Sequence, residues 1–177
     1  AFGSMDTVRQ EVCAAAVRVY DQYTNAGLQE KIPFFGVGMQ YIRFAREEPE
    51  LYRLLFLTRA QGQGWSAMQS MKHLQALVRP TLMEIYQITE LEADLYFRDL
   101  WLAVHSLSTL IVTDGCPYSD REIRQILTEV SISIFKSIRE IPGFSADAFD
   151  RDAVFSALIC KNAPELQQDL PPGEEKR

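Results

Sequence analysis

Apolar residues recur every three or four positions along most of this chain, the spacing that marks one face of an α-helix. No segment alternates apolar and polar residues for long, so the sequence predicts an all-α fold. Helices are expected at about 7–26, 33–48, 49–57, 65–86, 90–113 and 119–140, with a weaker one over 146–161.

The helix predicted at 90–113 contains the most apolar stretch of the chain, LWLAVHSLSTLIV at 100–112. A membrane span needs about 18 or more apolar residues, so this stretch is too short to cross a bilayer. A helix that is apolar on nearly every side is instead surrounded by protein. Thr89 with Glu92 has the spacing of a capping box at its start, as has Ser119 with Glu122 before the next helix.

Pro80 lies inside the helix predicted at 65–86. Its ring clashes with the carbonyl four residues earlier, so we expect a kink there that opens volume for a ligand. On the next helix, Asp94 and Arg98 have the spacing of a surface ion pair.

Length and composition indicate one globular domain, since 47% of the 177 residues are hydrophobic and 24% are charged. Residues 1–4 are interpreted as an expression scar, 5–162 as a single domain with its core at 7–140, and 163–177 as a flexible tail.

The net charge of −6 argues against direct binding of nucleic acid. Three widely spaced cysteines and no signal or membrane segment predict a cytoplasmic protein.

The chain contains none of the motifs that would indicate a common catalytic centre. Neither of its two histidines belongs to a Glu-x-x-His pair, and there is no glycine-rich phosphate loop after a strand and no Gly-x-Ser-x-Gly turn. The sequence therefore predicts a protein that is not an enzyme and holds no metal or cofactor.

His105, in the middle of the most apolar stretch, has two interpretations. It is either a buried neutral histidine bonded to a carbonyl or hydroxyl, or a polar group that orients a ligand in an apolar pocket. The methionines and aromatic residues of the neighbouring helices likewise either line such a pocket or form ordinary core.

The helix at 119–140 has more apolar positions than one contact face needs, because Ile132 lies off the main stripe. We expect a second copy to cover this surface, so that two hairpins meet as a four-helix bundle. The alternative is that the C-terminal helix covers it through Phe149, Phe155, Leu158 and Ile159.

Two segments together resemble the C-terminal domain of the TetR family of bacterial transcription regulators. In YIRFAREEPELYRLLF the resemblance is carried by Tyr41, Phe44, Ala45, Glu47, Pro49, Leu51, Tyr52, Leu55 and Phe56. In LWLAVHSLSTL, Trp101 and His105 match the family's Trp-x-x-x-His-Gly segment, and Ser106 stands where glycine is usual.

The resemblance implies a homodimer joined through the helices at 90–113 and 119–140, with a small apolar or amphipathic effector inside each subunit. Effector binding and DNA binding are then reciprocally coupled. The family's N-terminal helix-turn-helix is missing from this chain, so any DNA contact is expected through that absent domain, and no membrane partner is expected.

Two residue sets follow from this interpretation. The effector is expected to contact Phe44, Phe56, Met68, Met71, Met83, Tyr86, Trp101 and His105. The dimer interface is expected to contain Leu107, Leu110, Ile123, Ile126, Leu127, Val130 and Ile134. The alternative function is a helical protein-interaction adaptor without a small-molecule ligand, which a densely packed interior and an exposed apolar patch on the last helix would favour.

Overall fold

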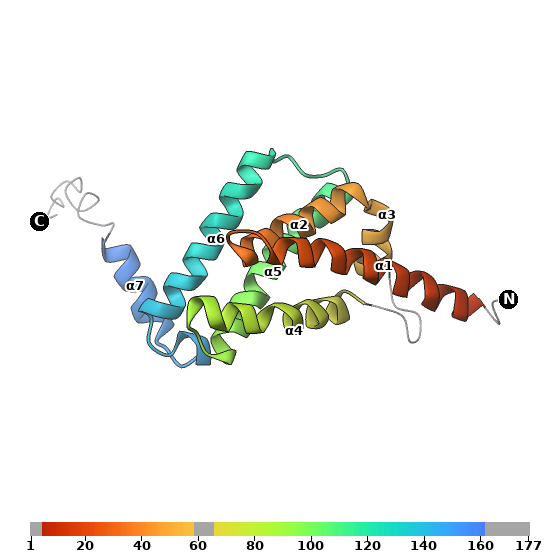
Figure 1. Ribbon diagram of the computed structural model, residues 1–177. Helices are drawn as coiled ribbons and strands as arrows, with labels where there is room; N and C mark the ends of the chain where they lie inside the picture. Colours follow the sequence, from red (N-terminus) through yellow and green to blue (C-terminus); the bar gives the residue numbers. More distant parts are fainter. Residues whose placement is uncertain (1–4, 59–65, 162–177) are drawn as a thin grey trace, which may run out of the picture.

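A computed structural model describes residues 5–58 and 66–161, and every element in these two ranges is helical, which confirms the all-α prediction (Figure 1). The predicted scar at 1–4, the predicted tail at 163–177 and Trp65 lie outside the described residues. The elements are α1 (Met5–Leu28), α2 (Pro33–Glu47), α3 (Pro49–Tyr52), the π-helix η1 (Arg53–Leu57), α4 (Ala67–Tyr86), α5 (Glu90–Val112), α6 (Asp120–Glu140), the 3₁₀-helix η2 (Phe144–Ala146) and α7 (Arg151–Lys161).

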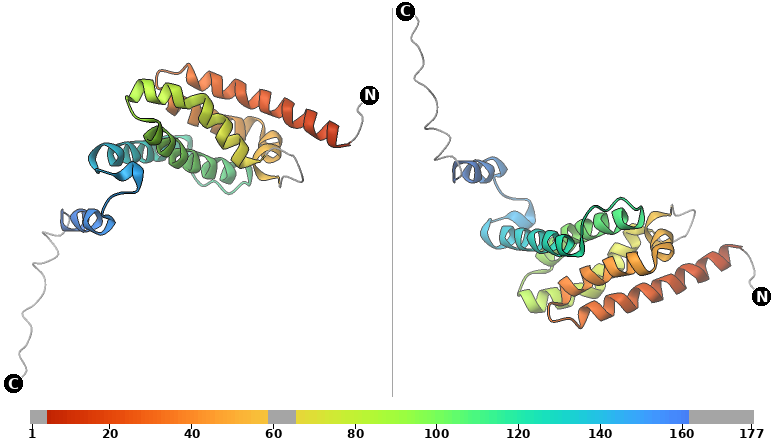
Figure 2. Two further views of the ribbon diagram at one scale, coloured as in Figure 1. Left: turned by 90° about the horizontal axis from the view of Figure 1, so that it is seen from below. Right: turned by 90° about the horizontal axis from the view of Figure 1, so that it is seen from above.

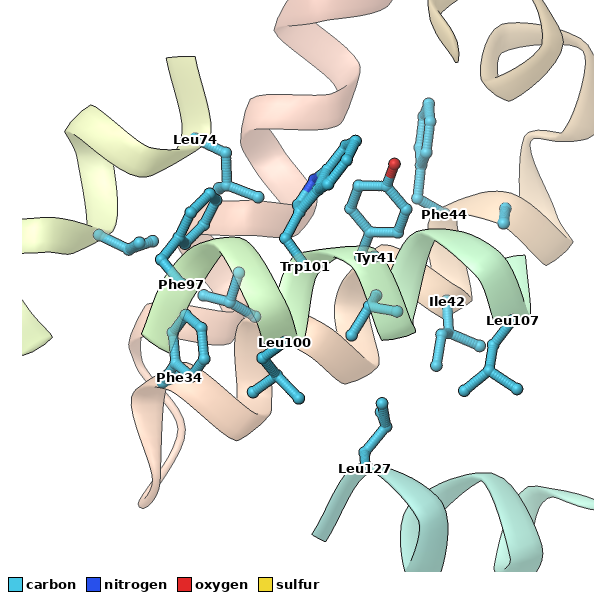
Figure 3. Packing of buried hydrophobic residues seen from close by; sticks show 14 of the residues in the cluster. Phe34, Tyr41, Ile42, Phe44, Leu74, Phe97, Leu100, Trp101, Leu107 and Leu127 are labelled. Carbon is cyan, nitrogen blue, oxygen red and sulfur yellow. The ribbon is translucent and has the colours of Figure 1, made fainter. Parts of the chain in front are cut away.

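Helix α5 lies at the centre of the bundle and packs against α2, α4 and α6 (Figures 1 and 2). Tyr41 of α2 and Trp101 of α5 lie on one side of α5, and Leu127 approaches the opposite side from α6 (Figure 3). The buried residues of α5 lie on the sides that meet these helices, whereas Leu102 and Leu110 in its most apolar stretch are 50% and 38% exposed. Helix α5 is therefore central but not surrounded by the chain on every side, which differs from the expectation for so apolar a helix.

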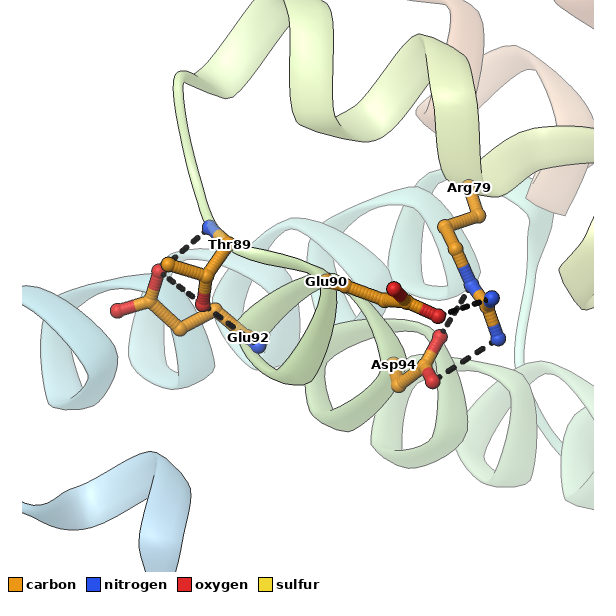
Figure 4. Close-up of polar contacts among 5 residues, drawn as sticks. All are labelled: Arg79, Thr89, Glu90, Glu92 and Asp94. Carbon is orange, nitrogen blue, oxygen red and sulfur yellow. Dashed lines mark hydrogen bonds and ion pairs between the residues drawn. The ribbon is translucent and has the colours of Figure 1, made fainter.

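Both predicted capping boxes are present. At the start of α5, the Thr89 amide donates to Glu92 Oε2 over 2.8 Å, and the Glu92 amide donates to Thr89 Oγ1 (Figure 4). Ser119 and Glu122 make the same reciprocal pair at the start of α6. Each pair satisfies backbone N–H groups that have no partner within the helix.

The single helix predicted at 49–57 is divided in the structure. After α3 the backbone widens into η1, where the Thr58 amide donates to the Arg53 carbonyl, five residues earlier, over 2.9 Å. Single π turns are frequent at functional sites because they change the direction of the side chains that follow. Here η1 directs Leu55 and Phe56 into the core.

Helix α4 begins at the cap residue Ser66, whose Oγ accepts from the Gln69 amide, and it continues through Pro80 without ending. Pro80 is exposed. None of the described cavities is lined by Pro80, so the expected volume for a ligand stays a prediction. Arg79, the residue before Pro80, reaches α5, where it binds Asp94 and Glu90 (Figure 4). Asp94 thus pairs between helices and not with Arg98, which binds Asp99 instead.

The C-terminal helix begins later than predicted. Gly143 and Asp147 adopt left-handed backbone conformations around η2, and the Asp150 carboxylate accepts from the Ala153 amide in the first turn of α7. Helix α7 then projects away from the bundle (Figure 2). Its Phe155, Leu158 and Ile159 are 62%, 55% and 67% exposed, so they do not cover α6. No helix in the described part of the chain is long and apolar enough to span a membrane.

Candidate functional site

A cluster of rings fills the space between α1, α2, α3, η1 and α5, and we call it the aromatic cluster. Its rings are 4.7–6.5 Å apart between centroids, the range in which aromatic pairs attract each other. It consists of Tyr20, Tyr41, Phe44, Tyr52, Phe56, Trp101 and His105. Segments that are far apart in the sequence therefore meet at one interior point.

Trp101 and His105 are the contribution of α5 to this cluster. They lie one helical turn apart, and their rings stack with centroids 4.7 Å apart and an angle of 7° between the planes. Phe56 contacts the His105 ring from η1, with centroids 5.8 Å apart. The imidazole is thereby held in one orientation by its ring neighbours.

Tyrosine hydroxyl groups surround one edge of the His105 ring. The hydroxyl oxygens of Tyr41 and Tyr52 each lie 3.0 Å from His105 Nδ1. Tyr52 also donates to the His105 carbonyl over 3.2 Å, and its hydroxyl lies 3.1 Å from Thr109 Oγ1. The hydroxyl partner expected for a buried neutral histidine is present, and it links three helices.

Burial sets the protonation states in this network. It lowers the pKa of His105, because removing the ring from water penalises the imidazolium. Burial also raises the pKa of Tyr52 to about 12 and that of Tyr41 well above its usual value. Near neutral pH the ring is therefore uncharged, and both phenols keep their protons. Tyr41 can donate to Nδ1 while Tyr52 donates to the carbonyl.

A small cavity lies next to the aromatic cluster. Its volume is about 20 Å³, enough for one water molecule. It is lined by Phe34, Val37, Gly38, Tyr41, Leu74, Phe97, Leu100, Trp101 and Val104. The indole Nε1 of Trp101 is buried and has no hydrogen-bond partner in the described structure. The cavity wall thus combines apolar side chains with one unsatisfied donor.

The structure brings together only part of the predicted effector site. Phe44, Phe56, Trp101 and His105 belong to the aromatic cluster. Met71 and Met83 are partly buried against the core, whereas Met68 is 55% exposed and does not line the interior. Met68 lies in the first turn of α4, whereas the buried residues Leu74, Val78 and Leu82 lie further along the helix.

Tyr86 lies in a second group of rings, against Tyr96 and Phe135, whose centroids are 5.8 and 5.1 Å away. It is therefore not part of the aromatic cluster. The tyrosines that approach His105 were absent from the predicted site, although Tyr41 and Tyr52 stand in the segment that carries the family resemblance. Helical spacing marks them as buried, but it does not show that their hydroxyl groups converge on a histidine 53 and 64 residues away.

The residues of the predicted dimer interface differ in their exposure within the single chain. Leu107, Ile123 and Leu127 are buried within the single chain, so they belong to its own core and offer no surface to a partner. Ile126, Val130 and Ile134 are half-buried and Leu110 is exposed, so these four remain accessible. Leu91 and Leu102 on α5 and Ile132 on α6 are further exposed apolar residues, and Ile132 lies on a different face of α6 from Val130 and Ile134.

No group of three or more His, Cys, Asp and Glu side chains that could hold a metal ion is present among residues 5–58 and 66–161. The aromatic cluster offers hydrogen bonding and ring contact in an apolar setting. Comparison of this chain with protein-family models, with curated proteins and with solved structures gives no match.

Proposed function

We propose that this chain is the effector-sensing and dimerisation domain of a TetR-like transcription regulator. The observation that supports this most is the unsatisfied Trp101 Nε1 at an apolar interior cavity, beside the hydrogen-bonded His105 ring. A buried donor without a partner costs about 1–3 kcal/mol, which a ligand with a suitably placed acceptor recovers. The expected effector is a mostly apolar molecule that carries such an acceptor.

Binding of this effector requires the interior to expand. Ligand sites usually have volumes of about 300–1,000 Å³, whereas this cavity has about 20 Å³. The effector therefore binds a more open state, in which rings of the aromatic cluster move apart. Since it binds that state more tightly than the closed one, it shifts the population towards it.

Tyr20 connects this change to α1. Its ring contacts Tyr41, Phe44 and Phe56, with centroids 5.4–5.7 Å away, and it is buried. A movement of the aromatic cluster therefore displaces α1, the helix from which a DNA-reading head would be moved. Such coupling is reciprocal, so DNA bound by that head would change effector affinity by the same factor.

The accessible apolar residues of α5 and α6 support the dimer part of the proposal. Leu91, Leu102 and Leu110 lie along the exposed side of α5, and Ile132 is exposed on α6. Exposed apolar side chains mark interaction sites where they gather into a patch. In a two-fold dimer the same surface of each copy would meet its equivalent.

A second candidate, the protein-interaction adaptor, is favoured by two observations. The interior cavity is very small, and α7 exposes large apolar side chains. Both were expected of a protein that works by pairing with other chains. In this case the unsatisfied indole is simply a local defect of the core.

Trp101 provides the experiment that separates the two candidates. The chain contains two tryptophans, so Trp65→Phe leaves Trp101 as the sole emitter. Small molecules that co-purify with the protein would be identified by native mass spectrometry and titrated into this variant. A saturable change of the Trp101 emission would support the effector-sensing function. Bound molecules that leave the emission unchanged, or none at all, would favour the adaptor.

A further inference from the structure

A groove separate from the aromatic cluster runs along the outer face of α2. Its volume is about 590 Å³, within the range of small-molecule sites. It lies between α2, the turn before it and the first turns of α6. The α2 residues that line it recur at helical spacing on the face turned away from Tyr41 and Phe44. The groove and the aromatic cluster thus occupy opposite sides of one helix.

The two ends of this groove differ in chemistry. Ile32, Phe35 and Met39 provide apolar surface near the start of α2. Arg43 and Arg46, on the last turns of α2, face Arg124 of α6 at the other end. Phe35 and Arg46 are eleven positions apart, which corresponds to about 16 Å along a helix. Glu30 and Lys31 also line the groove beside these apolar residues. The groove therefore offers a partly apolar path that ends among three guanidinium groups.

The charges at the arginine end are incompletely balanced. Arg43 binds Glu47, and Arg46 binds Asp120 across the groove. Arg124 makes no ion pair in the described structure. The Arg46–Asp120 pair is largely exposed, and pairs of this kind contribute little stability, so another carboxylate can replace Asp120 at low cost. Arginine is suited to this role because its planar fork binds carboxylates with two parallel hydrogen bonds.

We propose that this groove binds a small anionic amphiphile, with its alkyl chain along Ile32, Phe35 and Met39 and its acid group between Arg46 and Arg124. In this arrangement the ligand head competes with Asp120 for Arg46. The proposal does not depend on the effector site in the aromatic cluster, because no ring of that cluster lines the groove.

The test is titration of decanoate into the whole chain by calorimetry, below the concentration at which decanoate forms micelles. Arg124→Gln is expected to weaken binding by about five- to tenfold, since one charge-assisted contact is lost. Asp120→Asn is expected to tighten it by about two- to fivefold, because the competing carboxylate becomes neutral. Both side chains are exposed, so neither change disturbs the core. Arg18→Gln, an exposed arginine on α1, is the matched control and should leave affinity unchanged.

Two further ligands test whether binding needs the acid group and whether it occurs in solution. 1-Decanol has the same chain without the charge and should bind at least about tenfold more weakly than decanoate. Weaker binding of decanoate to Asp120→Asn, equal affinity of wild type and Arg124→Gln, or equal affinity for decanol would overturn the proposal. So would binding that occurs only on phosphatidylglycerol vesicles and not with decanoate in solution. Trp101 emission in the Trp65→Phe variant should stay unchanged on adding decanoate, which keeps this test separate from that of the interior effector.

Discussion

The imidazole of His105 lies flat against the indole of Trp101, with ring centroids 4.7 Å apart. At its edge, the hydroxyl oxygens of Tyr41 and Tyr52 lie 3.0 Å from Nδ1, which can accept the proton of Tyr41 while Tyr52 donates to the His105 carbonyl. One ring is thus held by its face and by its edge. Because Trp101 also lines the interior cavity, a molecule that enlarges the cavity on the side of Trp101 must displace this ring pair.

Replacement of Trp101 by alanine tests whether this interior can hold a ligand. Loss of the buried indole should lower the free energy of unfolding by about 3–5 kcal/mol, because the removed atoms leave a cavity. Added indole should restore part of that loss by binding the folded state alone. Urea unfolding with and without indole measures both effects. Met68→Ala is the control, since Met68 is exposed and should change stability by less than about 0.5 kcal/mol. If indole stabilises wild type as much as Trp101→Ala, the new cavity is not its site.

His105 should make stability depend on pH. Its pKa in the folded protein is lower than the value of 6.5 for a free histidine, so between these two values the unfolded chain binds more protons than the folded one. The stability contribution of the neutral ring is therefore complete above about pH 7. It is lost as the pH falls from the unfolded pKa through the folded pKa. Urea midpoints compared between pH 7.5 and pH 5.5 should fall more in wild type than in His105→Gln. Equal declines in both proteins would contradict the proposed role of burial.

The contact between Arg79 and Asp94 should stabilise the packing of α4 on α5. Arg79 Nε and Nη2 bind the two carboxylate oxygens of Asp94 over 2.7 and 2.9 Å, a two-point contact between partly buried groups. Asp94→Asn should lower the unfolding free energy by about 1 kcal/mol. Glu90→Gln should cost less than about 0.5 kcal/mol, because Glu90 is mostly exposed and contributes one contact. Denaturant unfolding measures the free energy of unfolding of both variants. An equal decrease in the two would show that the two-point contact of Arg79 with Asp94 stabilises the fold no more than the single contact with Glu90.

Leu102→Arg tests the proposed dimer surface. Leu102 on α5 and Ile132 on α6 are both half exposed, and the proposed interface contains them. An arginine at position 102 would therefore place a charge in that interface. Sedimentation velocity should show a dimer for wild type and a monomer for the variant. Val12→Arg introduces the same charge at an exposed apolar position on α1 and should remain dimeric. A monomeric wild type, or a dimeric Leu102→Arg variant, argues against this surface.

The sequence alone determined the helices and most of their ends. Helical spacing of apolar residues depends only on local geometry, so it identified the all-α fold and the central position of α5. The capping boxes at Thr89 and Ser119 could be recognised because both partners lie within one turn. Four members of the effector set that followed from the family resemblance, Phe44, Phe56, Trp101 and His105, meet in the aromatic cluster.

Only the tertiary structure decided which partners these residues meet. Tyr41 and Tyr52 reach His105 from other helices, and Asp94 binds Arg79 instead of Arg98, because these contacts depend on how the helices cross. The apolar residues of α6 illustrate the same limit. Periodicity marks Ile123, Leu127 and Val130 alike as apolar, but the packing of α2 and α5 on one side of α6 buries the first two within the chain. Local spacing gives each helix an apolar face, and only the neighbouring helices determine how much of it they cover.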